Sequence, residues 1–249
     1  MVRIIPDNGQ LTKPRFAPVG DCALTVEFGD TIDLDINRRV LALDRAIAIS
    51  DLPGIVETVP TFRSLLVVYE PEEIDFGTLT RRLSLMVDTS AAPRADRERL
   101  WTIPIAYDFP GNTDFERIRE ITRLTRDEVI RHHTSAEYDV FLIGFVPGMP
   151  IMGGLPEPLR IPRRPEPLPG IPAGRVMIAG GQVEIVTMTM WTGWYCIGQT
   201  PLRPYDLRAA NPFLFRAGDR VRFRAIGAED LDLLADAPAT VFLSEDEAA

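Results

Sequence analysis

Arginines are concentrated in one proline-rich stretch of this chain. Arg160, Arg163 and Arg164 lie within five residues, and prolines recur throughout residues 147–172. Proline fixes the backbone φ angle, so side chains on such a loop are held in fewer orientations than on an ordinary surface loop. A guanidinium presented in this way can bind a carboxylate or a phosphate through two parallel hydrogen bonds. We predict an anion-binding loop here, and the alternative is three solvated surface arginines.

A glycine-rich string just before this loop supplies backbone amides that could bind a carbonyl. Gly144, Phe145 and Gly148 belong to the sequence GFVPG, which predicts a tight turn. Backbone N–H groups exposed at such a turn can hold an oxygen that becomes negatively charged during a reaction. The alternative is that the glycines serve only positive φ angles or close packing.

Three uncharged polar residues beyond the loop are candidate substrate ligands. Gln182 follows a Gly-Gly turn, and Gln199 and Thr200 end a predicted strand. A substrate with an amide group offers one hydrogen-bond donor and one acceptor, which an amide side chain complements. Stabilisation of the turns by these side chains explains their positions equally well.

The chain has two histidines, and they are adjacent at the end of a predicted helix. Imidazole at this place interacts favourably with the helix C-terminus, which is sufficient to explain His132 and His133. Neighbouring helical positions point about 100° apart, so at most one of the two faces a given site. Two adjacent histidines without nearby cysteine or carboxylate ligands do not make a zinc site, and we predict no metal centre.

Composition excludes several classes of function. Lys13 is the only lysine among 27 basic residues, so the chain has no Gly-Lys-Ser/Thr string and no P-loop for ATP. The net charge of −9 argues against a nucleic-acid surface. The N-terminus lacks the apolar core of a signal peptide, and no apolar run approaches the ~20 residues of a membrane span. Two cysteines, Cys22 and Cys196, indicate no disulfide framework, and we expect a cytoplasmic protein without a membrane partner.

The elements that must position these residues divide into two parts. Residues 14–92 predict a small two-layer α+β domain, because short strands alternate with two helices of apolar period 3.6 (residues 33–49 and 76–86). Residues 98–228 predict a β domain, with short strands that suggest a closed barrel and two helices opened by capping boxes at Thr113 and Thr125. We expect tails at residues 1–13 and at the acidic residues 229–249.

The order of several strings resembles one known family. VGDCALTVEFGD, TFRSLLVVYEP, GFVPGMPIMGGLP, LRIPRRPEP, IPAGRVMIAGGQ, GWYCIGQTPLRPYD and FRAGDRVRF resemble the KipI / allophanate hydrolase subunit 1 family, over residues 14–226. The resemblance implies a cyclophilin-like barrel for the second domain. It also implies a catalytic or substrate-contacting role for His133, which matches a histidine of the family pattern, and a substrate-binding role for Arg63 in the string TFRSLLV.

The resemblance further implies a function in a complex. The best-defined members are the B-type components of bacterial ATP-dependent 5-oxoprolinase, which act with a KipA-type (allophanate hydrolase subunit 2) chain and a LamB/YcsF-type chain. ATP would be used by the complex, with Gly144–Gly148 at the oxyanion and Arg163 and Arg164 at a carboxylate or phosphate. Two alternatives stay open. One is a carboxyltransferase role on urea or allophanate, and the other is inhibition of a sensor histidine kinase.

Three departures from the family pattern leave the substrate open. Leu168 replaces an arginine in the proline-rich loop, residues 190–194 replace a Ser-Pro-Gly-Gly-Trp element, and residues 107–111 replace a Gly-Gly-x-Tyr-Gly element. All three lie in predicted loops that could shape a pocket.

Overall fold

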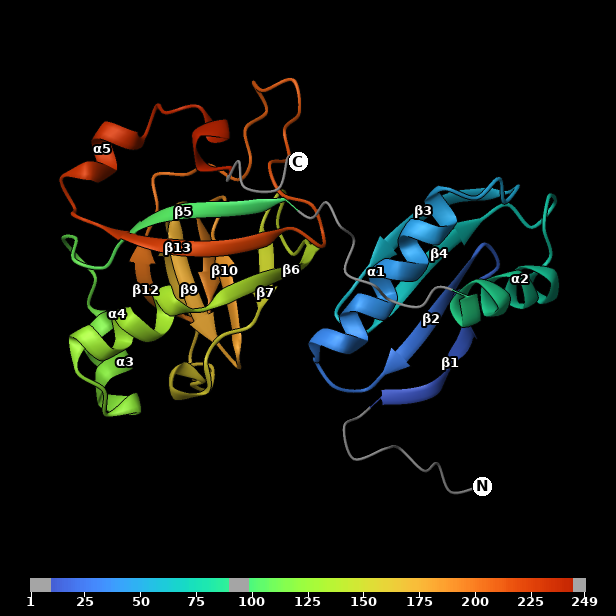
Figure 1. Ribbon diagram of the computed structural model, residues 1–249, viewed down its shortest axis with the longest axis horizontal. Helices are drawn as coiled ribbons and strands as arrows, with labels where there is room; N and C mark the ends of the chain where they lie inside the picture. Colours follow the sequence, from blue (N-terminus) through green and yellow to red (C-terminus); the bar gives the residue numbers. More distant parts are fainter. Residues whose placement is uncertain (1–9, 90–98, 244–249) are drawn as a thin grey trace. The chain divides into compact units, whose positions relative to one another are not determined.

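The chain forms two compact units, Met1–Ala95 and Asp96–Ala249 (Figure 1). The computed structural model describes residues 10–89 and 99–243. The division between the units, like the predicted domain boundary between residues 92 and 98, lies outside the described residues. The arrangement confirms the predicted fold class, an α+β protein whose small N-terminal domain is followed by a β-barrel domain.

The N-terminal unit is a two-layer α+β structure. Its antiparallel sheet has the strand order β1-β2-β4-β3, and the two helices pack on one face of it. The bounds are β1 Gln10–Pro18, β2 Ala23–Gly29, α1 Leu34–Ala48, β3 Ile55–Pro60, β4 Ser64–Tyr69 and α2 Phe76–Thr89. Alternate residues of β2 and β4, such as Val26 and Leu65, meet the apolar stripe of α1, as the two periodicities predict. Asp33 caps α1 by accepting hydrogen bonds from the amides of Asp35 and Ile36.

The first strand begins earlier than expected. We predicted a tail over residues 1–13, but residues 10–13 belong to β1, which pairs with β2. The sequence QLTK has little apolar content, and the pairing of its backbone with β2 places it in the sheet in spite of that.

The second unit is built around a closed barrel of seven strands, in the order β10-β7-β6-β13-β5-β12-β9. The strands are β5 Leu100–Ala106, β6 Glu137–Ile143, β7 Pro150–Gly153, β9 Arg175–Ala179, β10 Gln182–Ile185, β12 Tyr195–Gln199 and β13 Arg220–Ile226. β13 and β5 are parallel, and the other pairs are antiparallel. Alternate residues fill the interior, among them Ile103, Val140, Ile178, Val183 and Phe223.

Two helices pack against the barrel, α3 Asp114–Thr122 against β12 and α4 Arg126–Ser135 against β13 (Figure 1). The predicted capping box of α4 is present. The hydroxyl of Thr125 accepts from the amide of Glu128, and the Glu128 carboxylate accepts from the amide of Thr125. The predicted box of α3 is wrong. Thr113 already has helical backbone angles, so its hydroxyl makes no capping bond.

The proline-rich loop contains more strand than its prolines suggested. β7 begins at Pro150, and the short η1 Glu157–Leu159 follows it. β8 Leu168–Ile171 pairs with β11 Met190–Thr192 in a separate two-stranded ribbon. Proline is tolerated at the first residue of a strand and at an edge, which are the places that Pro150 and Pro169 occupy.

The C-terminal segment is not a free tail over its described length. We predicted a tail from residue 229, but α5 Asp230–Leu234 and η2 Ala239–Phe242 follow β13. Phe242 is buried in the barrel core, and Leu243 forms a β-bridge with Trp101. The prediction rested on the acidic composition of this segment. Burial of its apolar side chains holds the segment against the barrel in spite of those charges.

Candidate functional site

A cavity of about 300 Å³ opens at one end of the barrel. We call it the barrel-end pocket. It lies where β9 begins and where β10 and β12 end, and its wall is formed by residues 173, 174, 186, 187, 199–205, 231, 232 and 235. A second cavity of about 300 Å³ shares part of this wall, including Leu202 and Arg203. Volumes of this order are typical of sites for small molecules.

Gln199 and Thr200, both predicted as substrate ligands, line the barrel-end pocket. The amide of Thr200 donates to the carbonyl of Gly174 at 2.9 Å, and the Thr200 hydroxyl accepts from the amide of Leu202 at 3.2 Å. The side-chain oxygen of Gln199 accepts from Nη1 of Arg175. The two predicted ligands are therefore held in place by contacts within the wall.

The predicted glycine turn packs against the same pocket. Residues 144–149 connect β6 to β7, and the hydroxyl of Thr187 donates to the carbonyl of Pro147 at 2.7 Å. Gly148 has a φ angle of +69°, and a Cβ atom there would lie 2.6 Å from Cβ of Tyr205, a residue of the wall. Only glycine suits this backbone angle and this approach. The structure thus brings Gly148, Gln199 and Thr200 to one place.

The other two residues of the turn do not form the predicted oxyanion cradle in the arrangement seen. The amide of Gly144 donates to the carbonyl of Met149 at 3.1 Å, so it is already used within the turn. Phe145 has a left-handed φ angle of 68° and a side chain that is 77% exposed. A non-glycine residue in this conformation stores strain, and such strain is often found at functional sites.

The arginine loop separates into residues with different surroundings. The guanidinium of Arg164 makes its contacts within the protein. It forms an ion pair with Asp114 at the start of α3, and it stacks 4.1 Å from the ring centre of Tyr195. The other oxygen of Asp114 accepts from the amide of Cys196 at 2.8 Å. Arg160 is exposed, with one contact to the carbonyl of Leu155.

Arg163 lies beside a buried carboxyl group that the sequence analysis did not select. Glu184 is 3% exposed, and its carboxylate accepts from the hydroxyl of Thr192 at 3.5 Å. Burial raises the pKa of the Glu184 carboxyl to about 7, while the charge of Arg163 acts in the opposite direction. The guanidinium of Arg163 lies 5.5 Å from the ring centre of Trp194. Arg163 therefore lies near an acid and an aromatic ring, as Arg164 does, but its acid is Glu184 on the outer face of β10.

Gln182 also faces away from the barrel interior. Val183 and Ile185 point into the core, so Gln182 and Glu184 point to the opposite side of β10. Gln182 is 5% exposed, and within the described residues its Nε2 atom has no hydrogen-bond partner. The predicted substrate role of Gln182 thus belongs to the outer face of β10 and not to the barrel-end pocket.

His133, the predicted catalytic residue, is fully buried where α4 packs against β13. Its Nδ1 atom is 2.7 Å from the hydroxyl of Tyr107, its ring stacks on Phe223, and the hydroxyl of Tyr138 donates to its carbonyl. Among the described residues its Nε2 atom has no partner. Burial lowers the pKa of His133 to about 3, so the ring is neutral at pH 7. In this arrangement His133 packs in the core and lines neither of the two cavities described above, and its catalytic role stays a prediction.

Arg63 lies in the N-terminal unit, in the turn between β3 and β4. Its side chain is exposed, and its carbonyl accepts from the amide of Phe28 at 2.9 Å. Its predicted role in substrate binding likewise stays a prediction.

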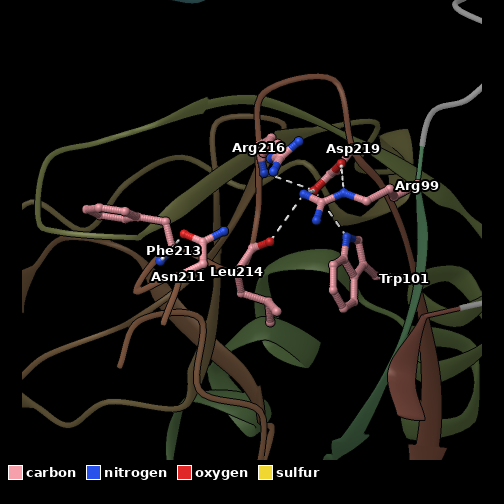
Figure 2. A network of polar contacts seen from close by, with 7 residues as sticks. All are labelled: Arg99, Trp101, Asn211, Phe213, Leu214, Arg216 and Asp219. Carbon is pink, nitrogen blue, oxygen red and sulfur yellow. Dashed lines mark hydrogen bonds and ion pairs between the residues drawn. The ribbon is translucent and has the colours of Figure 1, made fainter. Parts of the chain in front are cut away.

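A buried polar network supports the loop that forms the wall of the second cavity (Figure 2). The carboxylate of Asp219 accepts from the guanidinium of Arg99, from Nε1 of Trp101 at 3.1 Å and from the amide of Arg216 at 2.9 Å. Arg99 also donates to the carbonyl of Leu214. Because these donors satisfy a carboxyl group that is 4% exposed, the network fixes the loop and is not itself a site.

Two kinds of feature are absent within residues 10–89 and 99–243. No group of three or more His, Cys, Asp or Glu side chains is placed to hold a metal ion. No helix in these ranges has the length and apolar character needed to cross a membrane.

Two of the residues that sequence reasoning missed share one signal. Glu184 and Arg175 are charged residues in otherwise apolar strands, Val-Glu-Ile-Val and Arg-Val-Met-Ile, and a charge in such a run needs a partner. Asp114 opens a helix, where carboxylates are common, so nothing in the sequence distinguishes it. Tyr205 became relevant only through its contact with Gly148.

Comparison with known proteins places the chain among relatives of similar length. The family model for the carboxyltransferase domain, subdomain C and D, matches residues 14–215. The B-type component of 5-oxoprolinase from Bacillus subtilis (strain 168) is 34% identical over 222 residues, which is 85% of this chain and 92% of the relative.

Two solved structures are similar as well. TTHA0988 superposes with a TM-score of 0.73 at 32% identity over 83% of this chain, and the chain spans 40% of that longer protein. The urea carboxylase of Kluyveromyces lactis gives a TM-score of 0.72 at 20% identity, over 92% of this chain and 24% of that one. At this identity the likeness concerns the fold alone.

Proposed function

Since the chain belongs to the family of the carboxyltransferase domain, subdomain C and D, we propose that it is one component of an ATP-dependent 5-oxoprolinase. The observation that carries this proposal is its 34% identity to a B-type component of 5-oxoprolinase over 92% of that relative. The barrel-end pocket supports it, because the pocket is small and combines an amide, three hydroxyls and an arginine, which suit a lactam that bears a carboxylate.

The reaction that we propose is the opening of 5-oxoproline to glutamate. The lactam oxygen accepts the γ-phosphoryl group of ATP, and water attacks the activated carbon. The ring C–N bond breaks, its nitrogen takes up a proton, and hydrolytic loss of phosphate leaves glutamate. We place the lactam in the barrel-end pocket beside the turn of Gly144, Phe145 and Gly148, and we place a phosphate group at Arg163.

The other parts of this proposal concern the complex. We propose that a KipA-type chain and a LamB/YcsF-type chain complete the enzyme, and that all three act in the cytoplasm. With Lys13 as its only lysine, this chain has no P-loop, so ATP is bound by arginine forks, by backbone amides or by one of the other chains.

The test is reconstitution of the three-chain complex, with ATP-dependent release of glutamate from 5-oxoproline as the readout. We expect turnover to need all three chains and ATP, and Arg163→Ala to lower kcat/KM at least tenfold. Arg160→Ala is the matched control, because Arg160 lies on the same loop and its side chain contacts the carbonyl of Leu155 in place of an acid or an aromatic ring. A folded complex that uses urea or allophanate, with a biotinylated partner, and not 5-oxoproline would overturn the proposal.

A further inference from the structure

Arg175 and Gln199 form a polar pair at the edge of the barrel-end pocket. They are directly opposite each other in β9 and β12, so their side chains leave the same face of the sheet. Nη1 of Arg175 donates to the side-chain oxygen of Gln199. Gln199 is half-buried and lines the pocket, whereas Arg175 is not part of the pocket wall.

The chemistry of arginine decides which way the amide of Gln199 points. A guanidinium has only N–H donors, so it can face the carbonyl oxygen of the amide but not its NH₂ group. Arg175 is itself held in place, because its guanidinium stacks 4.1 Å from the ring centre of Phe109. The oxygen of Gln199 is therefore occupied, and the NH₂ group is turned away from Arg175.

The hydroxyls of the pocket complete a pattern of donors and acceptors. Thr187 donates its proton to the carbonyl of Pro147, so its oxygen is left as an acceptor. Thr200 accepts from the amide of Leu202, and its proton can still be donated. Arg203 and Asp232 are the charged residues of the wall.

We infer that Arg175 orients Gln199 so that the NH₂ group of Gln199 donates to the carbonyl oxygen of a cyclic amide bound in the barrel-end pocket. The N–H of the same amide donates to Thr187, and a carboxylate on the ligand pairs with Arg203. Arg175 is thus a positioning residue, and Gln199 is the residue that distinguishes a lactam from a ring without a carbonyl group. The inference rests on the proposed function and names the group that this site recognises.

The experiment uses NMR of the side-chain amides in the ¹⁵N-labelled full chain. Gln10, Gln182 and Gln199 are the only glutamines, so single variants assign their NH₂ signals. The ligands are 5-oxoproline, 2-pyrrolidinone, which lacks the carboxylate, and proline, which lacks the ring carbonyl. We expect the first two to shift the Gln199 signal and proline to leave it unchanged. The NH₂ signal of Gln182, on the outer face of β10, is the internal control and should not shift.

Three variants separate orientation from charge. Gln199→Glu keeps a partner for Arg175 but has no NH₂ group, and we expect the affinity for 5-oxoproline to fall at least tenfold. Arg175→Met frees the amide and lowers the affinity about fivefold, and Arg175→Lys, which also has only donors, restores most of the loss. In the complex these changes raise KM more than they lower kcat.

The outcomes distinguish this inference from the proposed function. Wild-type affinity in Gln199→Glu, equal shifts with proline, or no shift of Gln199 with any ligand would overturn the inference, even if the complex releases glutamate. Carbonyl-dependent shifts in a chain whose complex leaves 5-oxoproline intact would support the inference and overturn the proposed function.

Discussion

The surroundings of the two ends of strand β6 use polar side chains in opposite ways. At one end, beside the start of β6, His133 is enclosed by Tyr107, Tyr138 and Phe223 and is fully buried. At the other end, β6 runs into the glycine turn that packs against the barrel-end pocket. Gln199 is fixed there by Arg175 on one side and borders a cavity on the other. At the first end the polar groups are enclosed in the core. At the second end some hydrogen-bonding groups remain available to a ligand.

This difference shows why an unusual polar residue is an ambiguous signal. His133 and Gln199 look alike in the sequence, since each stands at the end of a predicted element. What separates them is the direction in which the remaining hydrogen-bonding groups point, which is a property of the fold. Three experiments test this contrast between the surroundings of His133, called the closed end, and the surroundings of Gln199, called the pocket end.

The largest expected effect is the response of the closed end to acid. Burial lowers the pKa of His133 to about 3, against about 6.5 in the unfolded chain. As the pH falls below 6.5, the imidazole of His133 binds a proton in the unfolded state but not in the folded state. The free energy of unfolding therefore decreases until about pH 3. The decrease is on the order of 3 kcal/mol at pH 4.5 and on the order of 4 kcal/mol at pH 3.

Urea unfolding of wild type and His133→Phe across this pH range measures the effect. The variant keeps an aromatic ring against Phe223 but cannot titrate, so its stability relative to wild type should improve as the pH falls. His132→Phe is the control and should keep the wild-type slope. Parallel pH profiles for His133→Phe and wild type would contradict the burial argument. Glutamate release lost in folded His133→Phe would support the predicted catalytic role.

An effect of similar size is expected at the network that supports the pocket end. Asp219→Asn removes one charge from a buried pair and leaves Arg99 without its counter-ion, which should lower the free energy of unfolding by about 3 to 5 kcal/mol. Asp206→Asn is the matched control, because Asp206 also pairs with an arginine, Arg208, on an exposed part of the neighbouring loop. Its loss of stability should be much smaller, because solvent screens an exposed pair. Equal losses in denaturant unfolding would show that burial does not separate the two pairs.

The sequence predicted the layers of both units because their patterns are local. The stripe of Ile36, Val40 and Leu43 in α1 and the alternation of Val183 and Ile185 in β10 each follow from one element facing one core. The capping box at Thr125 is equally local and was correct, whereas the one at Thr113 failed because that residue already enters the helical conformation.

The site could be predicted only in part, because it depends on contacts between distant residues. Gly148, Gln199 and Thr200 were selected and meet at one pocket. Arg175 gains its importance from being opposite Gln199, 24 positions away in sequence, and Glu184 from its burial beside Arg163. Register between strands and closure of the barrel fix those pairs, and neither can be read from a single sequence.

The smallest expected effect tests the contact that joins the turn to the pocket. Gly148→Ala forces a side chain into a positive φ angle and brings Cβ within 2.6 Å of Tyr205. We expect a loss of about 1 to 3 kcal/mol. Gly111→Ala is the control. Gly111 has a φ angle of +86° with open space around it, so this variant carries only the backbone cost, about 1 kcal/mol.

The difference between the two glycine variants reports the contact with Tyr205 alone. Tyr205 lines the barrel-end pocket, so its displacement should also weaken the binding of 5-oxoproline in Gly148→Ala and leave it unchanged in Gly111→Ala. Thermal unfolding and ligand titration of the same two samples measure both quantities. If both variants lose the same stability and neither loses affinity, the contact between Gly148 and Tyr205 contributes neither to stability nor to ligand binding.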